Sequence, residues 1–325
     1  MRRVIHTAQA LVDEVVEVPH LPATGGNVMA GSYQRHAGGA VTILLSAARC
    51  GACAVHAGSV GTGPNGDLIR ETLAADGVPV CSPPIEELDT GICVVMVEPS
   101  AERTFVTTQG AERRVTATSL GAARPGPGDV VCLSGYSLIE PTVSGLLPWL
   151  EDLSGAVPDL EIVLDPGAIF AELPQEIRDR ALAVTTVWTS NAEEADALAG
   201  TGDLTDAPKA VAAYLSANAV AVVRDGERGC AVHVGGRSAV VPGFPQTAVD
   251  TNGAGDTHTG ALCARIASSP AMSRDLDDWV AAATYANAAA AIKVTRRGPT
   301  TVPSGADVDE FLAAATVSAT SPRRR

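Results

Sequence analysis

The sequence predicts an α/β fold: a mostly parallel central sheet with helices on both faces and a small β-lid beside it. Short apolar segments typical of strands alternate with helical segments through most of the 325 residues, the pattern of parallel strands joined by helices. Hydrophobic residues make up 46% of the chain but aromatic residues only 3%, so the core must consist mainly of Ala, Val, Leu and Ile. Residues 14–36 and 90–110 do not fit the alternation, and we expect them to form the lid.

The first third of the chain is expected to contribute three strands and two helices to the main body. Residues 2–12 form the first strand, and an apolar helix follows over residues 39–51, ended by Gly51 at a C-terminal cap position. A second strand, an amphipathic helix and a third strand follow at residues 52–60, 66–77 and 78–82.

The rest of the chain continues the alternation and then becomes helical. Apolar strands separated by helical segments come first, followed by two or three strands with Gly-marked turns, and then by helices. We expect one domain over residues 1–316 and a disordered tail over residues 317–325. The predicted strands cover residues 129–135, 161–167, 186–191 and 219–243, and the predicted helices cover residues 141–153, 254–267, 275–292 and 306–315.

The composition excludes several classes of partner. The formal net charge is −14 and the pI ≈ 4.8, whereas nucleic-acid binding needs a basic surface. No stretch approaches the length of uninterrupted apolar sequence that a membrane span requires. The seven cysteines lack the spacing of a disulfide framework, and the isolated pair Cys50 and Cys53 is interpreted as ordinary buried thiols. We therefore expect a reduced, cytoplasmic chain of enzyme size that binds neither nucleic acid nor membrane.

Lysine is nearly absent, because Lys209 and Lys293 are the only two against 21 arginines. Neither lysine has the G-x-x-x-x-G-K-[ST] context of a Walker-type phosphate loop. If this protein handles phosphate, it does so with backbone amides, arginine and a metal ion.

Two glycine-rich stretches in the first third are candidate ligand sites with simple structural alternatives. "GTGPNG", Gly61–Gly66, matches the dinucleotide fingerprint between a predicted strand and helix. Pro64 interrupts that turn, however, and a glycine-rich turn needs no ligand to explain it. "AGGA", residues 37–40, permits close approach of the backbone to a ligand, or merely a tight turn.

A third stretch, "AVDTNGAGDTHTGALCARI" at residues 248–266, carries the strongest pattern. Its glycines precede a predicted helix whose first N–H groups suit an anion, while Asp256 at the same place acts as a helix cap or in chemistry. "DTNGAGDT" resembles the carboxy-terminal signature DTxGAGD of the ribokinase-like (PfkB-type) carbohydrate kinases. The resemblance runs from Val4 to Phe311: the segment around "AGGA" is similar to the amino-terminal signature, "SNAEEA" to the N-x-x-E element, "RDGERG" to the G-x-x-G turn, and "YANAAAAIKVTRRG" to the helix and loop that close over the nucleotide base.

This resemblance implies a ribokinase-like three-layer sandwich that transfers the γ-phosphoryl of ATP to a hydroxyl of a small sugar. The amides of Gly253, Ala254, Gly255 and Asp256 are implied to hold the transferring phosphoryl group. Asp256 is implied to accept the proton of the attacking hydroxyl. A carboxylate at a helix start is also expected to stay ionised at neutral pH.

Further roles carry over from the family by position. Asp13, at the end of the first predicted strand, is implied to bind substrate hydroxyls, and Glu194 to organise Mg²⁺ through waters. A monovalent cation, K⁺, is implied between the segment before the glycines and the loop 294–300, and many relatives dimerise through the lid. The remaining residues implied by the resemblance are Gly38 and Gly39 for the sugar, Asn191, Arg224, Gly226, Gly229 and Asn287 for ATP, and Asp250 and Asn252 for the K⁺.

Two positions depart from the family pattern. Ile43 stands where the family usually carries an Asn that binds the sugar, and Arg224 stands where many relatives carry Thr. The acceptor is therefore open between a small sugar, a nucleoside and another small polyol. One alternative is a non-catalytic protein that binds a sugar or nucleotide, but the retained Asp256 argues against it. Another is a nicotinamide-dependent oxidoreductase, which would depend on Gly61–Gly66 alone.

Overall fold

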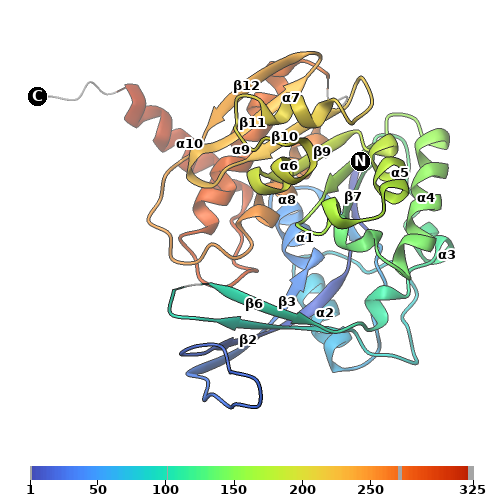
Figure 1. The fold of residues 1–325 in the computed structure, drawn as a ribbon. Coiled ribbons are helices and arrows are strands. Elements are labelled where there is room, and N and C mark those ends of the chain that lie inside the picture. The colour runs from blue at the N-terminus through green and yellow to red at the C-terminus, as the bar shows by residue number, and fades with distance from the viewer. Residues whose placement is uncertain (1, 101, 270–272, 321–325) are drawn as a thin grey trace, which may run out of the picture.

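Eight strands form the central sheet of the computed structural model, which describes residues 2–100, 102–269 and 273–320 (Figure 1). From one edge to the other, the strands are β12 (Arg237–Pro242), β11 (Gly229–Val234), β10 (Val220–Arg224), β9 (Val187–Asn191), β8 (Glu161–Asp165), β7 (Val130–Ser134), β1 (Arg3–His6) and β4 (Cys53–His56). The strands from β10 to β4 run parallel, and β11 and β12 extend one edge in antiparallel pairing. The predicted mostly parallel sheet is confirmed.

Helices cover both faces of this sheet, because its strands alternate apolar side chains between two cores. Val4 belongs to one buried cluster and Ile5 to the other, as expected when successive side chains point to opposite faces. Helices α1 (Ala40–Arg49), α2 (Pro64–Ala75), α8 (Ala254–Ser268), α9 (Leu276–Lys293) and α10 (Gly305–Thr320) pack into the first cluster. The second contains α3 (Ala117–Gly121), α4 (Thr142–Ala156), α5 (Gln175–Val184), α6 (Ala192–Ala199) and α7 (Ala207–Ala212).

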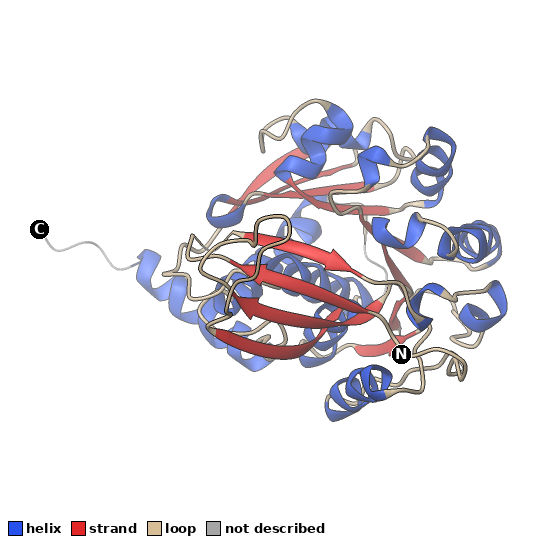
Figure 2. Cartoon of the chain, turned by 60° about the horizontal axis from the view of Figure 1, so that its bottom comes forward, coloured by secondary structure: helices blue, strands red, loops and turns tan. Residues whose placement is uncertain are grey.

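A second sheet of four strands lies beside the main body, in the foreground of Figure 2. Its order is β3 (Ser32–Gly39), β2 (Ala10–Glu17), β5 (Ile92–Val97) and β6 (Arg103–Thr107). It contains strands from both segments that the sequence placed outside the alternation, but β2 and β3 extend beyond the predicted residues 14–36, to Ala10 and Gly39. We call it the small sheet.

Three sequence-based boundaries need correction. The strand predicted over residues 2–12 is two strands, so Asp13 lies within β2 of the small sheet and not at the end of the first strand. Residues 78–82 form only a single bridge to β4 instead of a strand. Helix α10 continues to Thr320, through the start of the tail predicted at 317, and residues 321–325 lie outside the described part of the chain. Among the described helices, none is long and apolar enough to cross a membrane.

The crossing of α1 and α8 brings the starts of these two helices to the same edge of the sheet. A side chain at Gly260 would place its Cβ 2.3 Å from the Ile43 carbonyl oxygen, so only glycine allows this close approach. The Ser46 hydroxyl donates to the Thr257 carbonyl at 2.8 Å across the same contact. The α1–α8 contact therefore fixes where the first turn of α8 lies.

Replacing Gly260 with Ala should destabilise the fold by about 1–3 kcal/mol, because the added methyl group overpacks the helix crossing. Gly155 of α4 is the matched control, since a Cβ there meets nothing within 4 Å. Gly155→Ala should be neutral or stabilising by up to about 1 kcal/mol, since alanine is the better helix former. Chemical denaturation of both variants checks this, and equal stabilities would show that the crossing is not tight.

Candidate active site

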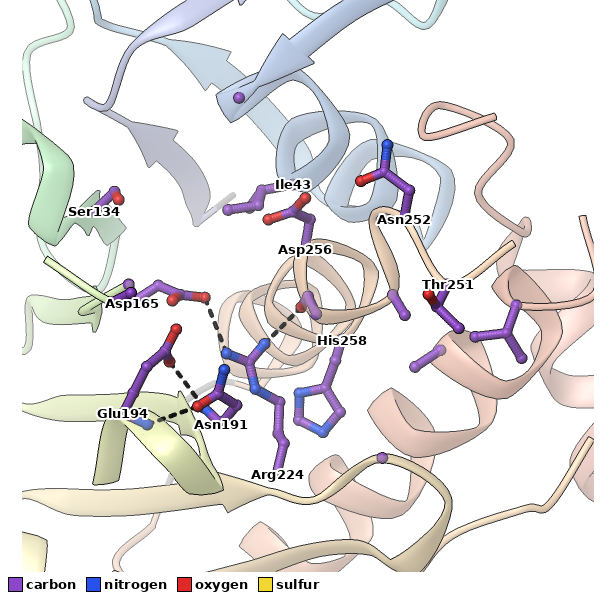
Figure 3. Close-up of a pocket in the computed structure, with 18 of the residues that line it drawn as sticks. Ile43, Ser134, Asp165, Asn191, Glu194, Arg224, Thr251, Asn252, Asp256 and His258 are labelled. Carbon is purple, nitrogen blue, oxygen red and sulfur yellow. Dashed lines mark hydrogen bonds and ion pairs between the residues drawn. The ribbon is translucent and has the colours of Figure 1, made fainter. Parts of the chain in front are cut away.

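A cavity of ≈ 990 Å³ opens at the carboxyl ends of the parallel strands, where ligands bind in open α/β sheets (Figure 3). Leu11 and Phe105 border it from the small sheet. Four polar residues that line it are each the last residue of a neighbouring strand: Ser134 of β7, Asp165 of β8, Asn191 of β9 and Arg224 of β10.

The first turn of α8 presents backbone N–H groups to this cavity. Gly253 begins the helix with φ of 76°, and a Cβ there would lie 2.9 Å from the Pro299 carbonyl oxygen and 3.1 Å from Thr42 Cγ2. The Ala254 amide already donates to the Thr251 carbonyl at 3.2 Å. Among the described residues, none accepts a hydrogen bond from the Gly255 or Asp256 amide. These two amides are therefore the donors available to an anion.

Asp256 faces the cavity next to Ile43 and is densely surrounded by protein, although one side remains solvent-accessible (Figure 3). Burial raises the pKa of its carboxyl to about 7, and the negative charge of Asp165 acts in the same direction. Arg224 opposes this rise, while Asp13 and Glu194 add to it. The expectation that the helix start keeps Asp256 fully ionised at neutral pH is therefore wrong, because burial and the neighbouring carboxylates together outweigh the helix dipole.

Arg224 connects the strand ends to the glycine turn. Its guanidinium donates to the Ser190 carbonyl at 3.1 Å and to the Gly255 carbonyl at 2.7 Å. It also donates to the Thr259 hydroxyl at 3.0 Å and forms an ion pair with Asp165 at 3.3 Å. Although Arg224 lines the cavity, most of its donors are thus used within the protein. Arg224 therefore holds the glycine turn in place through the Gly255 carbonyl and supplies positive charge among the carboxylates.

Asn191 and Glu194 form a reciprocal capping box at the start of α6. The Asn191 side-chain oxygen accepts from the Glu194 amide at 2.7 Å, and Glu194 Oε2 accepts from the Asn191 amide at 2.9 Å (Figure 3). Both residues line the cavity. Burial is the main cause that raises the pKa of Glu194, followed by the charge of Asp165. A structural role and a ligand role are compatible here, because one Glu194 oxygen remains outside the cap.

The glycine pair on β3 makes room for Asp13 and for α1. A Cβ on Gly38 would lie 2.3 Å from Asp13 Oδ2, and one on Gly39 would lie 2.4 Å from the Gln9 carbonyl oxygen. Gly39 lines the cavity, whereas Gly38 supports the Asp13 carboxylate from behind. Burial raises the pKa of Asp13 to about 6, and Asp13 lies close enough to raise the pKa of Asp256.

The residues predicted to line the nucleotide also border the cavity. Gly226 and Gly229 have φ of 51° and 94°, and a Cβ on Gly229 would lie 2.2 Å from the Val241 carbonyl oxygen. Asn287 of α9 donates to the Val241 and Pro242 carbonyls, both at 3.2 Å. Its amide therefore ties α9 to β12 in addition to lining the cavity.

Two segments are expected to hold a monovalent cation: the one that contains Asp250 and Asn252, and the loop 294–300. Side chains of the protein connect them. The Asp250 carboxylate accepts from the amides of Asn252 and Gly298, both at 2.9 Å, and from Arg103 at 3.2 Å. The Lys293 ammonium, fully buried, donates to the carbonyl oxygens of Asp250 at 3.5 Å and Arg296 at 3.3 Å. A protein cation therefore lies where the resemblance implies K⁺.

The alternative dinucleotide motif has a structural explanation. The Asp89 carboxylate accepts from the amides of Asn65 at 3.0 Å and Gly66 at 3.0 Å, at the start of α2. A side chain of the protein thus occupies the place of a phosphate, and none of the Gly61–Gly66 residues lines the cavity described above.

Several cavity residues were not predicted from the sequence. Asp165 ends a predicted strand in "EIVLDPG", and a carboxylate at the end of a parallel strand is a signal that could have identified it. Tyr136 lies at the strand end "CLSGYS", which is expected to face the substrate, but no role could be assigned to it. Phe105 and His258 carried no such signal. Burial lowers the pKa of His258 to about 3, so this ring is neutral in the cavity wall.

Comparisons with known proteins identify the family of this chain. The model of the pfkB family of carbohydrate kinases matches residues 6–305. The chain is 29% identical over 264 residues to the uncharacterized sugar kinase YegV of Escherichia coli, covering 80% of each chain. It is 25% identical over 309 residues to the ribokinase of Haemophilus influenzae, covering 92% of this chain and 95% of that protein.

Solved structures share the fold. The ribokinase of Giardia lamblia superposes with a TM-score of 0.85 at 22% identity, covering 97% of this chain and 99% of that one. The Arabidopsis thaliana ribokinase complexed with ribose and ATP gives 0.77 at 23% identity, with 96% and 99% covered. A double mutant of Vibrio cholerae fructokinase in its fructose, ADP and potassium ion bound form gives 0.76 at 22% identity, with 96% and 98% covered. The ribokinase-like fold is thereby confirmed.

At pH values above about 7, Asp256→Asn should have a higher melting temperature than the wild type. Because the folded-state pKa of Asp256 is raised to about 7, the folded protein keeps a proton that the unfolded chain has released, and wild-type stability falls as pH rises toward that value. Asn cannot ionise, so the variant escapes this loss, and the gain should shrink toward about pH 4. Melting curves across this range test it, with exposed Asp152→Asn on α4 as the control. A variant that melts below the wild type at every pH would contradict the expected burial of a charge.

Proposed function

The chain belongs to the pfkB family of carbohydrate kinases, and from this membership we propose that it transfers the γ-phosphoryl of ATP to a hydroxyl of a small sugar, with Asp256 as the base. One observation carries the assignment of roles: a carboxyl group whose pKa is about 7 lies directly beside two unpaired amides at the start of α8. Proton acceptance and anion binding are thus available at one point in the cavity.

On the acceptor side, the sugar hydroxyl lies between Asp256 and the phosphoryl group. Asp256 takes the hydroxyl proton as the oxygen attacks phosphorus, and the bond from phosphorus to the ADP oxygen breaks. The amides of Gly255 and Asp256 stabilise the charge on the phosphoryl oxygens, which is the main contribution a protein makes to this chemistry. Asp13 would accept a hydrogen bond from another sugar hydroxyl.

On the donor side, ATP extends from the start of α8 past the ends of β9 and β10. Gly226, where a Cβ would meet nothing within 4 Å, leaves an open backbone surface for the nucleotide, and Gly229 and Asn287 border the same cavity. The Arabidopsis ribokinase binds ATP in the same fold. Arg224 would act on the phosphates mainly through its charge, since its donors bind the protein.

Mg²⁺ fits this site as an ion held through its waters. Among the described residues, no three His, Cys, Asp or Glu side chains are grouped to bind a metal directly. Glu194 and Asp165 lie close enough for the charge of one to raise the pKa of the other, so a cation between them and the phosphates would relieve their repulsion. The ion would supply charge neutralisation of the ATP phosphates.

A riboside carrying an aromatic base is a second candidate acceptor. Phe105 and Tyr136 keep 57% and 46% of their surface exposed, and both line the cavity. Leu11 and Ile43 add aliphatic surface where a free sugar would need polar partners. Phe105 lies on the small sheet. The small sheet also exposes the apolar side chains of Tyr33 and Val106, and this surface would suit a homodimer.

Asp256→Asn should lower turnover by roughly 10²–10⁴-fold, the usual effect of removing a positioned base. The assay follows ATP consumption with Mg²⁺ across a panel of sugars and nucleosides. Because the same variant should be at least as stable as the wild type near neutral pH, loss of activity would not reflect unfolding. Wild-type turnover in the variant would refute the base assignment. Acceptor binding without turnover in the wild-type protein would favour the non-catalytic alternative.

Asp165→Asn should shift the pH profile of kcat/KM toward acid by about one unit. Its charge raises the pKa of Asp256, and its removal also releases Arg224 to act on Asp256 alone. Both changes favour the ionised base. The control is Asp179→Asn at an exposed position of α5, which should leave the profile unchanged. An unshifted profile in Asp165→Asn would show that the ionisation seen in the pH profile does not belong to Asp256.

A further inference from the structure

We propose that the Lys293 ammonium replaces the monovalent cation expected at this site, so that the protein works without K⁺. This inference rests on the proposed kinase function for its effect on turnover. It concerns the two backbone segments that lie beside the start of α8, residues 249–253 and 294–300. A solved V. cholerae fructokinase structure is in a potassium ion bound form, whereas the positive charge between these two segments in this chain belongs to a lysine side chain.

The position of the ammonium is the main support. Lys293 is the last residue of α9, and its side chain is fully buried. Its Nζ lies 3.5 Å from the Asp250 carbonyl oxygen and 3.3 Å from the Arg296 carbonyl oxygen, one on each segment. Backbone carbonyl oxygens are hard donors of the kind that bind such cations. The ammonium therefore binds the atoms that a cation at this place would use.

The choice of residue in this chain is informative. Of 23 basic residues other than histidine, only Lys209 and Lys293 are lysine, and Lys209 is exposed on α7. An ammonium is a compact point charge, whereas the guanidinium of arginine is planar and larger. Burial lowers the pKa of Lys293; Asp250 and Asp256 oppose that change, and the nearby charges of Arg103 and Arg296 add to it. A buried charge is costly unless it is paired, so this lysine must stabilise something specific.

Lys293 stabilises the two backbone segments that hold the first turn of α8, where the phosphoryl group is proposed to bind. The Val249 and Asp250 amides both donate to the Val294 carbonyl, at 2.7 and 3.1 Å, and Asp250 also accepts from Gly298. Gly253 packs against Pro299 of the second segment. Lys293 adds to these contacts between the two segments and places a positive charge behind the first turn of α8. It is thus a positioning residue, which acts through the Gly255 and Asp256 amides.

The first test uses the wild-type protein alone. Turnover with Mg²⁺-ATP and the melting temperature are each measured in KCl and in choline chloride at equal ionic strength. We expect the same values in both salts. Activation of more than roughly tenfold by K⁺, or a melting temperature raised by K⁺ but not by choline, would overturn the proposal. The melting comparison holds even if no kinase acceptor is found, so failure of the proposed function is distinguishable from failure of this inference.

Variants then separate the charge from the volume of the side chain. Lys293→Met keeps most of the volume, so it should lower kcat by roughly tenfold or more with little change in KM, and added K⁺ should not restore it. Lys293→Ala leaves space, and K⁺ should raise both its kcat and its melting temperature. Lys209→Met is the matched control and should behave as the wild type in both salts. Wild-type kcat and melting temperature in Lys293→Met, or an equal response of Lys293→Ala and the wild type to K⁺, would overturn the proposal.

Discussion

The repulsion among carboxylates at one edge of the sheet is the constraint on which the site depends. Asp165 ends β8, Glu194 lies in the first turn of α6, Asp256 lies in the first turn of α8, and Asp13 reaches the same region from the small sheet. Arg224 is the cation bonded directly into this group, through Asp165 and the carbonyl of Gly255. Like charges brought together in a partly buried cavity cost stability, and such arrangements are typical of functional sites. Burial is the main cause of the raised pKa of Asp256, and this crowding adds to it.

Close backbone contacts hold these charges in place. Gly260 lets α8 cross α1, Gly39 lets the start of α1 approach Gln9, and Gly38 leaves room for Asp13. Each of these glycines would collide with the backbone or with a buried carboxylate if it carried a Cβ. The glycine-rich signatures are therefore required by the packing itself. Asn191 and Glu194 likewise have a structural role, because their capping box fixes a strand end that faces the cavity.

Much of the fold could be predicted because strand and helix patterns are local. The break between β1 and β2 could not, since residues 7–9 contain no glycine or proline to mark it, and Asp13 was therefore assigned to the wrong strand. Most of the residues implied by the family signature line the cavity, whereas Asp13, Gly38, Asp250 and Gly253 do not. The pKa of Asp256 depends on its burial and on carboxylates that are distant in the sequence. Asp165 belongs to no motif. Lys293 follows a helix predicted to end one residue earlier, and its burial depends on loops that only the fold brings together.

We propose that Asp256 and the amides beside it direct phosphoryl transfer from ATP to a hydroxyl. This can be measured by following ³¹P NMR signals of ATP mixed with the wild-type protein, Mg²⁺ and candidate sugars or ribosides. We expect the γ-phosphoryl signal to be replaced by that of a phosphate monoester, in equal amount with ADP. Release of inorganic phosphate in place of the ester, with every acceptor that the protein binds, would contradict it.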